Sequence, residues 1–354
     1  MRVLVVNPGS SSLKVRVVDD AGAAAGTGAP EVVASADVPC AEGAAEAERL
    51  HAFMGGVKGL DAAGVRFVHG GAAFRRPVVV DSGVREALGE IADLAPLHNP
   101  PALDAIRVLA ELWPDLPVAA CFDTAFFADL PPAAATFAVP RRWTEEWGVR
   151  RFGFHGLSHS WASRQAAERL GRAGDRAFRV VTAHLGAGAS LAAVRGGAPV
   201  DTTMGFTPLD GLVMATRCGA VDPGVLVWAQ RHHGLTVDDL ERILDRESGL
   251  LGLSGRSGDM RVVVGAAEAG DAAAGLALDV YLHRLRGSIA AMAAALGGLD
   301  ALAFTGGVGE HSAAVRDRTC DGLAFLGVGG AVPVLVVEAR EDLAILSEVR
   351  RLLG

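Results

Sequence analysis

A strand, a glycine-containing turn and a second strand occur twice in this chain, about half a chain apart, and this repetition constrains the fold most. The first copy, VLVVNPGSSSLKVRVVDD from Val3, joins an apolar run to a stretch in which apolar and charged residues alternate, which indicates one buried and one half-exposed strand. The second copy, RVVTAHLGAGASLAAVRGG from Arg179, has Gly186 where the first has Gly9. The two hairpins predict a duplicated architecture in which each half presents its turn to a shared cleft.

A third glycine turn lies near the C-terminal end. The stretch ALAFTGGVGEHSAAVRDR predicts a strand ending at Thr305, a glycine-rich turn, and a helix beginning near Ser312. Glycine lets the backbone approach a ligand closely, and exposed amide groups at such turns bind phosphate. Ordinary turn chemistry explains any one of the three stretches, but three in one chain favour phosphate binding.

Composition limits the class of protein. The 354 residues exceed what one hydrophobic core usually organises, so two domains are expected. A formal net charge of -8 argues against a general nucleic-acid binder. The cysteines lack metal or disulfide spacing and predict reduced thiols in the cytoplasm; they are Cys40, Cys121, Cys218 and Cys320. We expect no secretory signal, and SIAAMAAALGGLDALAF fits an internal helix and a following strand better than a membrane span.

An ordered series of motifs resembles the acetate kinase family, whose superfamily also holds sugar kinases, Hsp70 chaperones and actin. The motifs span most of the chain: NPGSSSLK from Asn7, VRFVHGG from Val65, LAPLHNPP from Leu94, FDTAF from Phe122, RRFGFHGLSH from Arg150, DTTMGFTPLDGL from Asp201, TRCGAVDPG from Thr216 and FTGGVGEHS from Phe304. Such a series is specific for the family and much less specific for which short carboxylate is used.

The resemblance implies an α/β, two-domain actin-like ATPase (ribonuclease H-like) fold, with duplicated mixed sheets flanked by helices and the active site in the interdomain cleft. It implies an N-terminal domain of residues 1–122 plus 340–354 and a C-terminal nucleotide-binding domain of residues 123–339. The last segment, EDLAILSEVRRLLG, has an apolar stripe that we expect to pack on the first domain. The stripe consists of Leu343, Leu346, Val349 and Leu353.

The activity implied is that of a phosphotransferase with a carboxyl group as acceptor: reversible, Mg²⁺-dependent transfer of the ATP γ-phosphoryl group to acetate by direct in-line displacement, giving acetyl phosphate and ADP. Two anions must approach each other, so the reaction needs charge neutralisation and placement. Arginine suits this need because its planar guanidinium donates two hydrogen bonds at once. An ionised carboxylate is already a nucleophile at neutral pH, so no general base is required.

The resemblance also assigns residues to this chemistry. The catalytic set is Arg66, Asp123, His155 and Arg217. The carboxylate substrate is expected at Arg66, Val68, Leu97, Phe154 and Pro208. ATP is expected at Ser12, Lys14, His184, Gly186, Gly188, Asp259, Met260, Arg261, Gly306, Gly307, Val308 and Gly309. Mg²⁺, with Mn²⁺ as an alternative, is expected at Asn7 and Glu341, because this ion needs few protein ligands beside ATP and water.

Several of these residues also have ordinary structural interpretations. An arginine can be a surface or ion-pair residue, Glu341 can favour a helix start by its charge, and the apolar residues can belong to a core. His155 and His159 have the i, i+4 spacing of a zinc pair, but the glycines before His155 and the lack of a third ligand argue against a metal there. His98 is expected beside phosphate or substrate, and His69 is expected to brace its turn.

The chain departs from the usual family pattern at five places, which bear on nucleotide preference and rate. Ala187 and His311 each stand where asparagine is usual. Phe127 and Val65 each stand where histidine is usual, and Leu157 stands where threonine is usual. A propionate or butyrate kinase, or pyrophosphate in place of ATP, therefore stays open. A nucleotide-binding regulatory protein is a further alternative, which the catalytic arginines argue against. Relatives imply a homodimer.

Overall fold

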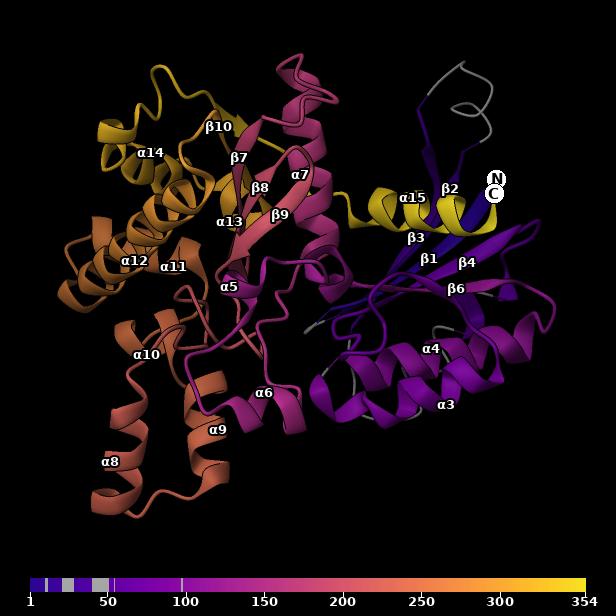
Figure 1. Ribbon diagram of the computed structural model, residues 1–354, viewed down its shortest axis with the longest axis horizontal. Coiled ribbons are helices and arrows are strands. Elements are labelled where there is room, and N and C mark those ends of the chain that lie inside the picture. The colour runs from indigo at the N-terminus through magenta and orange to yellow at the C-terminus, as the bar shows by residue number, and fades with distance from the viewer. Residues whose placement is uncertain (10–11, 21–28, 40–50, 54, 97) are drawn as a thin grey trace. The chain divides into compact units, whose positions relative to one another are not determined.

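The computed structural model describes residues 1–9, 12–20, 29–39, 51–53, 55–96 and 98–354 (Figure 1). The predictions made for Leu97, Cys40 and the side chain of Ser12 lie outside the described part of the chain. Contacts between Cα atoms divide the chain into two compact units. The first unit comprises Met1–Ala128, Phe154–Leu157 and Arg340–Gly354, and the second comprises Asp129–Gly153 and Ser158–Ala339.

The first unit contains a mixed sheet with the strand order β3-β2-β1-β4-β6-β5. Strand β1 pairs antiparallel with β2, as the first hairpin predicts, and parallel with β4, which in turn pairs parallel with β6. The carboxyl ends of β1, β4 and β6 therefore meet at one edge of the sheet. The strands are β1 (Arg2–Pro8), β2 (Ser12–Asp19), β3 (Glu31–Pro39), β4 (Ala62–Phe67), β5 (Val78–Val79) and β6 (Val118–Phe122).

Helices cover both faces of this sheet (Figure 1). Side chains alternate along a strand, so Ala63 and Val65 of β4 join the buried cluster that includes α4, whereas Gly64 faces α15. A Cβ at Gly64 would lie 2.5 Å from Ile345 of α15, so glycine is what allows this helix to approach. The helices are α3 (Ser82–Glu90), η1 (Ala92–Leu94), α4 (Asn99–Leu112), η2 (Asp123–Phe127) and α15 (Glu341–Leu353).

The C-terminal helix packs on the first sheet, as predicted, but its buried stripe differs in part. Leu346 and Val349 are buried, as expected. Ile345, which was not predicted, is also fully buried, whereas Leu343 and Leu353 are only half-buried. The difference arises because Gly64 has no side chain, which leaves room for Ile345 and Val349 to pack directly on the strand.

The second unit repeats the pairing of the first, with the strand order β11-β10-β7-β8-β9. Strand β7 pairs antiparallel with β8 and parallel with β10, as β1 does with β2 and β4. The predicted second hairpin and the duplicated mixed sheets are thus confirmed. The strands are β7 (Arg179–Leu185), β8 (Ala189–Arg195), β9 (Ala198–Thr202), β10 (Ala301–Thr305) and β11 (Val334–Val336).

A long central helix packs on the second sheet. Helix α12 contacts β7, β8 and β9 and is itself covered by α10 and α11 (Figure 1), so the predicted internal helix and following strand are confirmed. Among the described residues, none of the helices is both long and apolar enough to cross a membrane. The helices are α5 (Pro132–Ala135), α6 (Arg141–Trp147), α7 (Gly156–Arg169), α8 (Pro223–His233), α9 (Val237–Arg246), α10 (Gly249–Ser254), α11 (Met260–Glu268), α12 (Ala272–Leu296), α13 (Gly306–His311), α14 (Ala313–Asp321) and η3 (Ala324–Leu326).

The helix after β10 begins earlier than predicted. The strand ends at Thr305 as expected, but α13 starts at once at Gly306 and only α14 starts after Ser312. The prediction of a single helix from near Ser312 was wrong because a side chain supports the early turn. The carboxylate of Glu310 accepts the backbone N–H of Gly306 at 2.9 Å, which satisfies a donor that glycine-rich sequence alone leaves open.

Candidate active site

A buried ion pair lies at the carboxyl ends of two neighbouring parallel strands. Arg66 is at the end of β4, and Asp123 directly follows β6. The guanidinium donates from Nε to Oδ1 of Asp123 at 3.2 Å and from Nη2 to Oδ2 at 2.6 Å. This fork fixes the guanidinium plane. The parallel pairing of β4 with β6 is what brings the two residues together.

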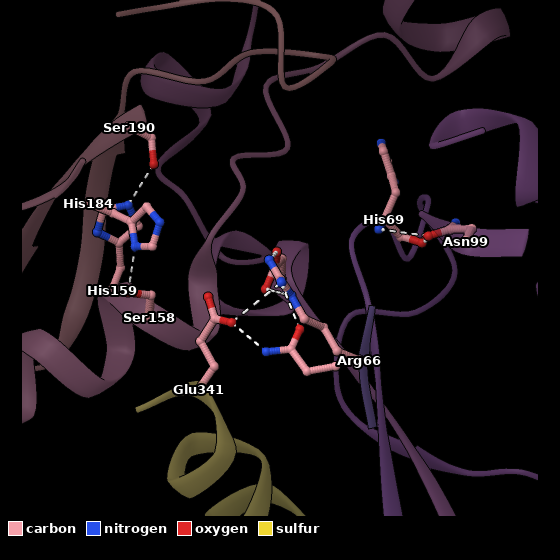
Figure 2. A network of polar contacts seen from close by, with 10 residues as sticks. Arg66, His69, Asn99, Ser158, His159, His184, Ser190 and Glu341 are labelled. Carbon is pink, nitrogen blue, oxygen red and sulfur yellow. Dashed lines mark hydrogen bonds and ion pairs between the residues drawn. The ribbon is translucent and has the colours of Figure 1, made fainter. Parts of the chain in front are cut away.

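Two further residues complete this cluster from other elements. Asn7 of β1 accepts a hydrogen bond from Nη1 of Arg66 at 2.9 Å and donates from Nδ2 to Glu341 at 2.6 Å. Glu341 begins α15, and its Oε2 lies 3.4 Å from Nη1 of Arg66. Figure 2 shows Arg66 and Glu341 facing each other. The structure thus unites Asn7, Arg66, Asp123 and Glu341, which are far apart in sequence.

The charged groups of this cluster shift one another's pKa values. Burial alone lowers the pKa of Arg66, but the charges of Asp123 and Glu341 outweigh it and raise that pKa above its ordinary value. Burial raises the pKa of Asp123, and both Arg66 and the backbone N–H of His155 oppose that shift. Arg66 is therefore a permanent cation beside two carboxylates.

His155 stands in a strained turn beside Asp123. Its φ of 56° is in the left-handed region, and no other described residue apart from glycine has a positive φ. Such strain in a non-glycine residue is typical of functional sites. Helix α7 begins only after it, so the prediction that His155 lies outside regular helix is confirmed. The following Gly156 packs so tightly that a Cβ there would overlap the carbonyl oxygen of Asp123.

Two residues expected around the substrate's methyl group are buried near this turn. Val68 and Phe154 both belong to the first unit, and the ring of Phe154 contacts that of His69 edge to face at 5.3 Å. His69 accepts the backbone N–H of Gly71 at Nδ1, at 2.8 Å, which confirms that it braces its turn. The side chain of Asn99 accepts the backbone N–H of His69 and donates to its carbonyl oxygen (Figure 2).

The second unit holds a separate polar network at the end of β7. His184 accepts or donates at Nδ1 with Oγ of Ser158 at 2.8 Å. His159 is fully buried, and its ring nitrogens contact the hydroxyls of Thr182 at 2.7 Å and of Ser190 at 2.8 Å. Figure 2 shows the contact with Ser190. Both ring nitrogens of His159 are thus engaged by hydroxyls. Burial, helped by His184, lowers the pKa of His159 well below 6.5.

Arg217 lies in a loop of the second unit, before α8. Its Nη1 donates to the carbonyl oxygen of Pro208 at 3.0 Å, and its Nε lies 3.3 Å from Oδ1 of Asp245 in α9. Burial lowers the pKa of Arg217, and the charge of Asp245 opposes this shift. The neighbouring Ala215 donates its N–H to Ala187 at 3.0 Å, so the loop rests on the second glycine turn.

Residues expected to bind ATP are distributed along the chain as follows. Lys14 is exposed on β2 of the first unit, and the others with described side chains lie in the second unit. Gly186 donates its N–H across its own turn to Gly188 at 2.9 Å. Asp259 caps α11 by accepting the N–H of Arg261, and their side chains also form an ion pair at 2.6 Å. Asp259 and Arg261 thus have a local structural role that does not depend on a nucleotide.

The donor set in the first unit fits a magnesium ion. Asn7, Asp123 and Glu341 carry oxygen atoms of the kind that Mg²⁺ binds, and the ion needs only one or two carboxylates beside phosphate and water. In this structure both oxygens of Asp123 and Oδ1 of Asn7 also accept hydrogen bonds from Arg66. No cluster of three His, Cys, Asp or Glu side chains that could hold a metal by themselves occurs among the described residues. A magnesium site at these side chains would therefore be completed by phosphate oxygens and water.

The family of the chain follows from comparison with known proteins. A model of the acetokinase family matches residues 2–348. The chain belongs to the acetokinase family. It is 48% identical over 309 residues to an acetate kinase of Synechococcus sp., a match that covers 82% of this chain and 76% of that protein.

Solved structures of family members share the fold. Acetate kinase of Porphyromonas gingivalis is 32% identical, with a TM-score of 0.88 and full coverage of both chains. A propionate kinase of Francisella tularensis is also 32% identical, with a TM-score of 0.87, and the alignment covers 99% of this chain and 100% of that one. The predicted fold class is thereby confirmed.

Three residues of these networks were not singled out from sequence. Ser158 holds His184, Asp245 holds Arg217, and Glu310 caps the turn after β10 while also accepting the N–H of Ala339 at 2.9 Å. Ser158 and Glu310 fall inside family motifs, so their position was a usable signal. Asp245 lies in a helix rich in charged residues, where nothing in the spacing distinguishes it from a surface acid.

Proposed function

We propose that the protein transfers the γ-phosphoryl group of ATP to acetate, reversibly and with Mg²⁺, giving acetyl phosphate and ADP by direct in-line displacement. The observation that carries this proposal is the buried cluster of Asn7, Arg66, Asp123 and Glu341 beside a strained His155, in a chain of the acetokinase family. A permanent cation braced by carboxylates suits a reaction in which anions meet.

The chain's own residues bind and orient the reactants. Arg66 and Arg217 each supply a guanidinium that offsets the charge of the acetate carboxylate and the transferred group. The imidazole of His155 donates a hydrogen bond to a phosphoryl oxygen. Asp123 orients Arg66, because it holds both Nε and Nη2. When bound, Mg²⁺ neutralises phosphate charge, and Asn7, Asp123 and Glu341 are the residues that would hold it.

The choice of carboxylate and donor is the part of this proposal that needs a direct test. Val68 and Phe154 are buried apolar side chains suited to a methyl group, and discrimination of one methylene is worth about 1–3 kcal/mol. We expect acetate to be preferred, with overlapping use of propionate and little of butyrate. Trapping of acyl phosphate with hydroxylamine, with each acid and with ATP or pyrophosphate, measures both preferences. Activity only with pyrophosphate, or only with butyrate, contradicts the proposal.

A homodimer is proposed as the working form, as the family implies. Three large apolar side chains of α8 are about half exposed, namely Val225, Val227 and Trp228, and such a patch is typical of protein interfaces. Light scattering after size exclusion should give twice the 36.4 kDa of one chain. The variant Trp228→Glu should shift the mass toward one chain with unchanged circular dichroism. A wild-type mass of one chain contradicts the dimer, and an unchanged mass of the variant contradicts this surface.

A cytoplasmic location is proposed from cysteine usage. Cys121, Cys218 and Cys320 are free thiols, which is the usual state in a reducing compartment. Fractionation of cells that express the chain should find it with cytoplasmic markers, and recovery in a secreted or periplasmic fraction would contradict this location.

A further inference from the structure

The guanidinium of Arg217 is held by the protein on two of its three nitrogens. Nη1 donates to the carbonyl oxygen of Pro208 at 3.0 Å and also contacts Sδ of Met214 at 3.7 Å. Nε forms an ion pair with Oδ1 of Asp245 at 3.3 Å. In the described part of the chain, Nη2 has no protein acceptor within hydrogen-bond distance. The protein therefore orients Arg217 while leaving one edge for a ligand.

Three hydrogen bonds join the end of α9, which carries Asp245, to the loop that carries Arg217. The hydroxyl of Thr216 donates to the carbonyl oxygen of Asp245 at 2.8 Å, and the N–H of Cys218 donates to that of Leu244 at 3.0 Å. The N–H of Ser248, just past α9, donates to the carbonyl of Thr216 at 2.9 Å. The residues on both sides of Arg217 are thus bonded to the end of α9, so the position of the Asp245 carboxylate relative to Arg217 is well defined.

Two physical consequences follow from this arrangement. An arginine side chain has several rotatable bonds, and a partner that fixes Nε removes much of the entropy that would otherwise be lost when a ligand binds. The side chains of Arg217 and Asp245 are 15% and 30% exposed, so their attraction is only partly screened by water. Asp245 therefore both directs the guanidinium and offsets part of its charge.

We propose that Asp245 is a positioning residue for Arg217, which turns the Nη2 edge of the guanidinium toward the substrate carboxylate. The inference rests on the proposed function insofar as Arg217 contacts that carboxylate. Asp245 itself touches no reactant. Its contribution should appear in steps that depend on the carboxylate substrate and not in the binding of ATP.

Steady-state kinetics of single and double variants tests this role. Asp245→Ala should lower kcat/KM for acetate about tenfold, a loss between that of an exposed and that of a buried ion-pair partner, with KM for ATP unchanged. Asp245→Asn keeps an oxygen beside Nε but not the charge, so it should lower kcat/KM for acetate less than Asp245→Ala does. In an Arg217→Ala background, Asp245→Ala should have no further effect. Equal loss in both backgrounds, or an equal change in KM for ATP, would overturn the proposal.

A matched control and a second readout keep this test separate from that of the proposed function. Glu241→Ala removes the same charge from an exposed site on the same helix and should leave the kinetics unchanged. Nitrogen-15 spectra report the Nε–H of Arg217 directly, and its peak is assigned by its loss in Arg217→Lys. The peak should be sharp in the wild type and in Asp245→Asn, and broadened or lost in Asp245→Ala. A peak unchanged in Asp245→Ala overturns the positioning role, even if no acyl phosphate is formed by any variant.

Discussion

At the scale of single residues, Arg66 shows how one side chain serves both stability and the proposed chemistry. Among the described residues its guanidinium bonds Asp123, Asn7 and Glu341, which leaves one N–H of Nη2 for a ligand. Because each partner is itself buried or half-buried, removing the cation leaves carboxylates without their counter-charge. The residue is therefore structurally required whether or not a substrate is bound.

We predict that Arg66→Met destabilises the protein by about 3–5 kcal/mol, the usual cost of breaking a buried ion pair. Part of the effect comes from Asp123, whose pKa burial already raises and would raise further without the opposing charge of Arg66. Chemical denaturation followed by circular dichroism measures the change. The control is Arg107→Met, which removes an exposed ion pair with Glu111 at 2.8 Å and should cost at most about 1 kcal/mol. Similar losses in both variants would argue against the buried cluster.

Gly156 tests the strained turn at His155. A Cβ there would overlap the carbonyl oxygen of Asp123 and approach Cβ of Phe126 at 2.7 Å, so Gly156→Ala should destabilise by about 1–3 kcal/mol or more. Gly265→Ala is the control, because that glycine in α11 has open space around it and alanine there should stabilise by up to about 1 kcal/mol. Thermal unfolding distinguishes the two signs. A variant at Gly156 as stable as the wild type would mean that the turn relaxes easily.

The identities of these residues could be read from sequence, but their pairings could not. Family motifs point to Arg66, Asp123 and Glu341 one by one. Their meeting depends on β4 lying beside β6 and on α15 returning to the first sheet, and a motif carries no strand order. Asp245 was missed for the same reason, because its role is defined only by what lies next to it in space.

At the scale of secondary-structure elements, alternation and apolar runs predicted both hairpins and the long internal helix. These patterns did not predict where a helix begins or which of its residues are buried when a residue from elsewhere in the chain determines it. Glycine has a low helix propensity, so the run after β10 predicted a turn, yet Glu310 holds Gly306 in the first turn of α13. The buried stripe of α15 was predicted only in part, since Ile345 was missed and Leu343 and Leu353 are only half-buried. Gly64 on the neighbouring strand, and not the helix sequence, sets how the helix approaches the sheet.

The network between α7, β7 and β8 gives a prediction about pH. The pKa of His159 is lowered well below 6.5 by burial and by His184. Well above pH 6.5 both folded and unfolded chains hold this histidine neutral, so its stabilisation is fully present. Below pH 6.5 the unfolded chain takes up a proton that the folded chain does not, so stability falls.

Between pH 6.5 and 5.5, His159 should account for about 1 kcal/mol of lost unfolding free energy. Urea denaturation at the two pH values measures the loss, and His159→Gln should show a loss smaller by that amount. His51→Gln, at an exposed histidine, should lose as much as the wild type. An identical pH dependence in His159→Gln and the wild type would mean that His159 is protonated in the folded protein.

At the scale of the whole molecule, the two units carry the same strand pairing, with a central strand joined antiparallel to one neighbour and parallel to the other. The repeated hairpin in the sequence was the visible trace of this duplication, since it recurs at the same place in each sheet. The family resemblance placed the C-terminal helix in the first domain, and the structure groups it with the first unit. The helix sequence by itself does not say which sheet it covers.

The measurement that tests the central claim most directly is ATP-dependent formation of acetyl hydroxamate from acetate, compared between the wild type and Arg217→Ala. The wild type should form acetyl phosphate. The variant should be slower in kcat by about 10²–10³-fold, as for other donors that stabilise charge in a transition state, with its fold unchanged by circular dichroism. A wild-type protein that forms no acetyl phosphate, or a variant as fast as the wild type, would contradict the account.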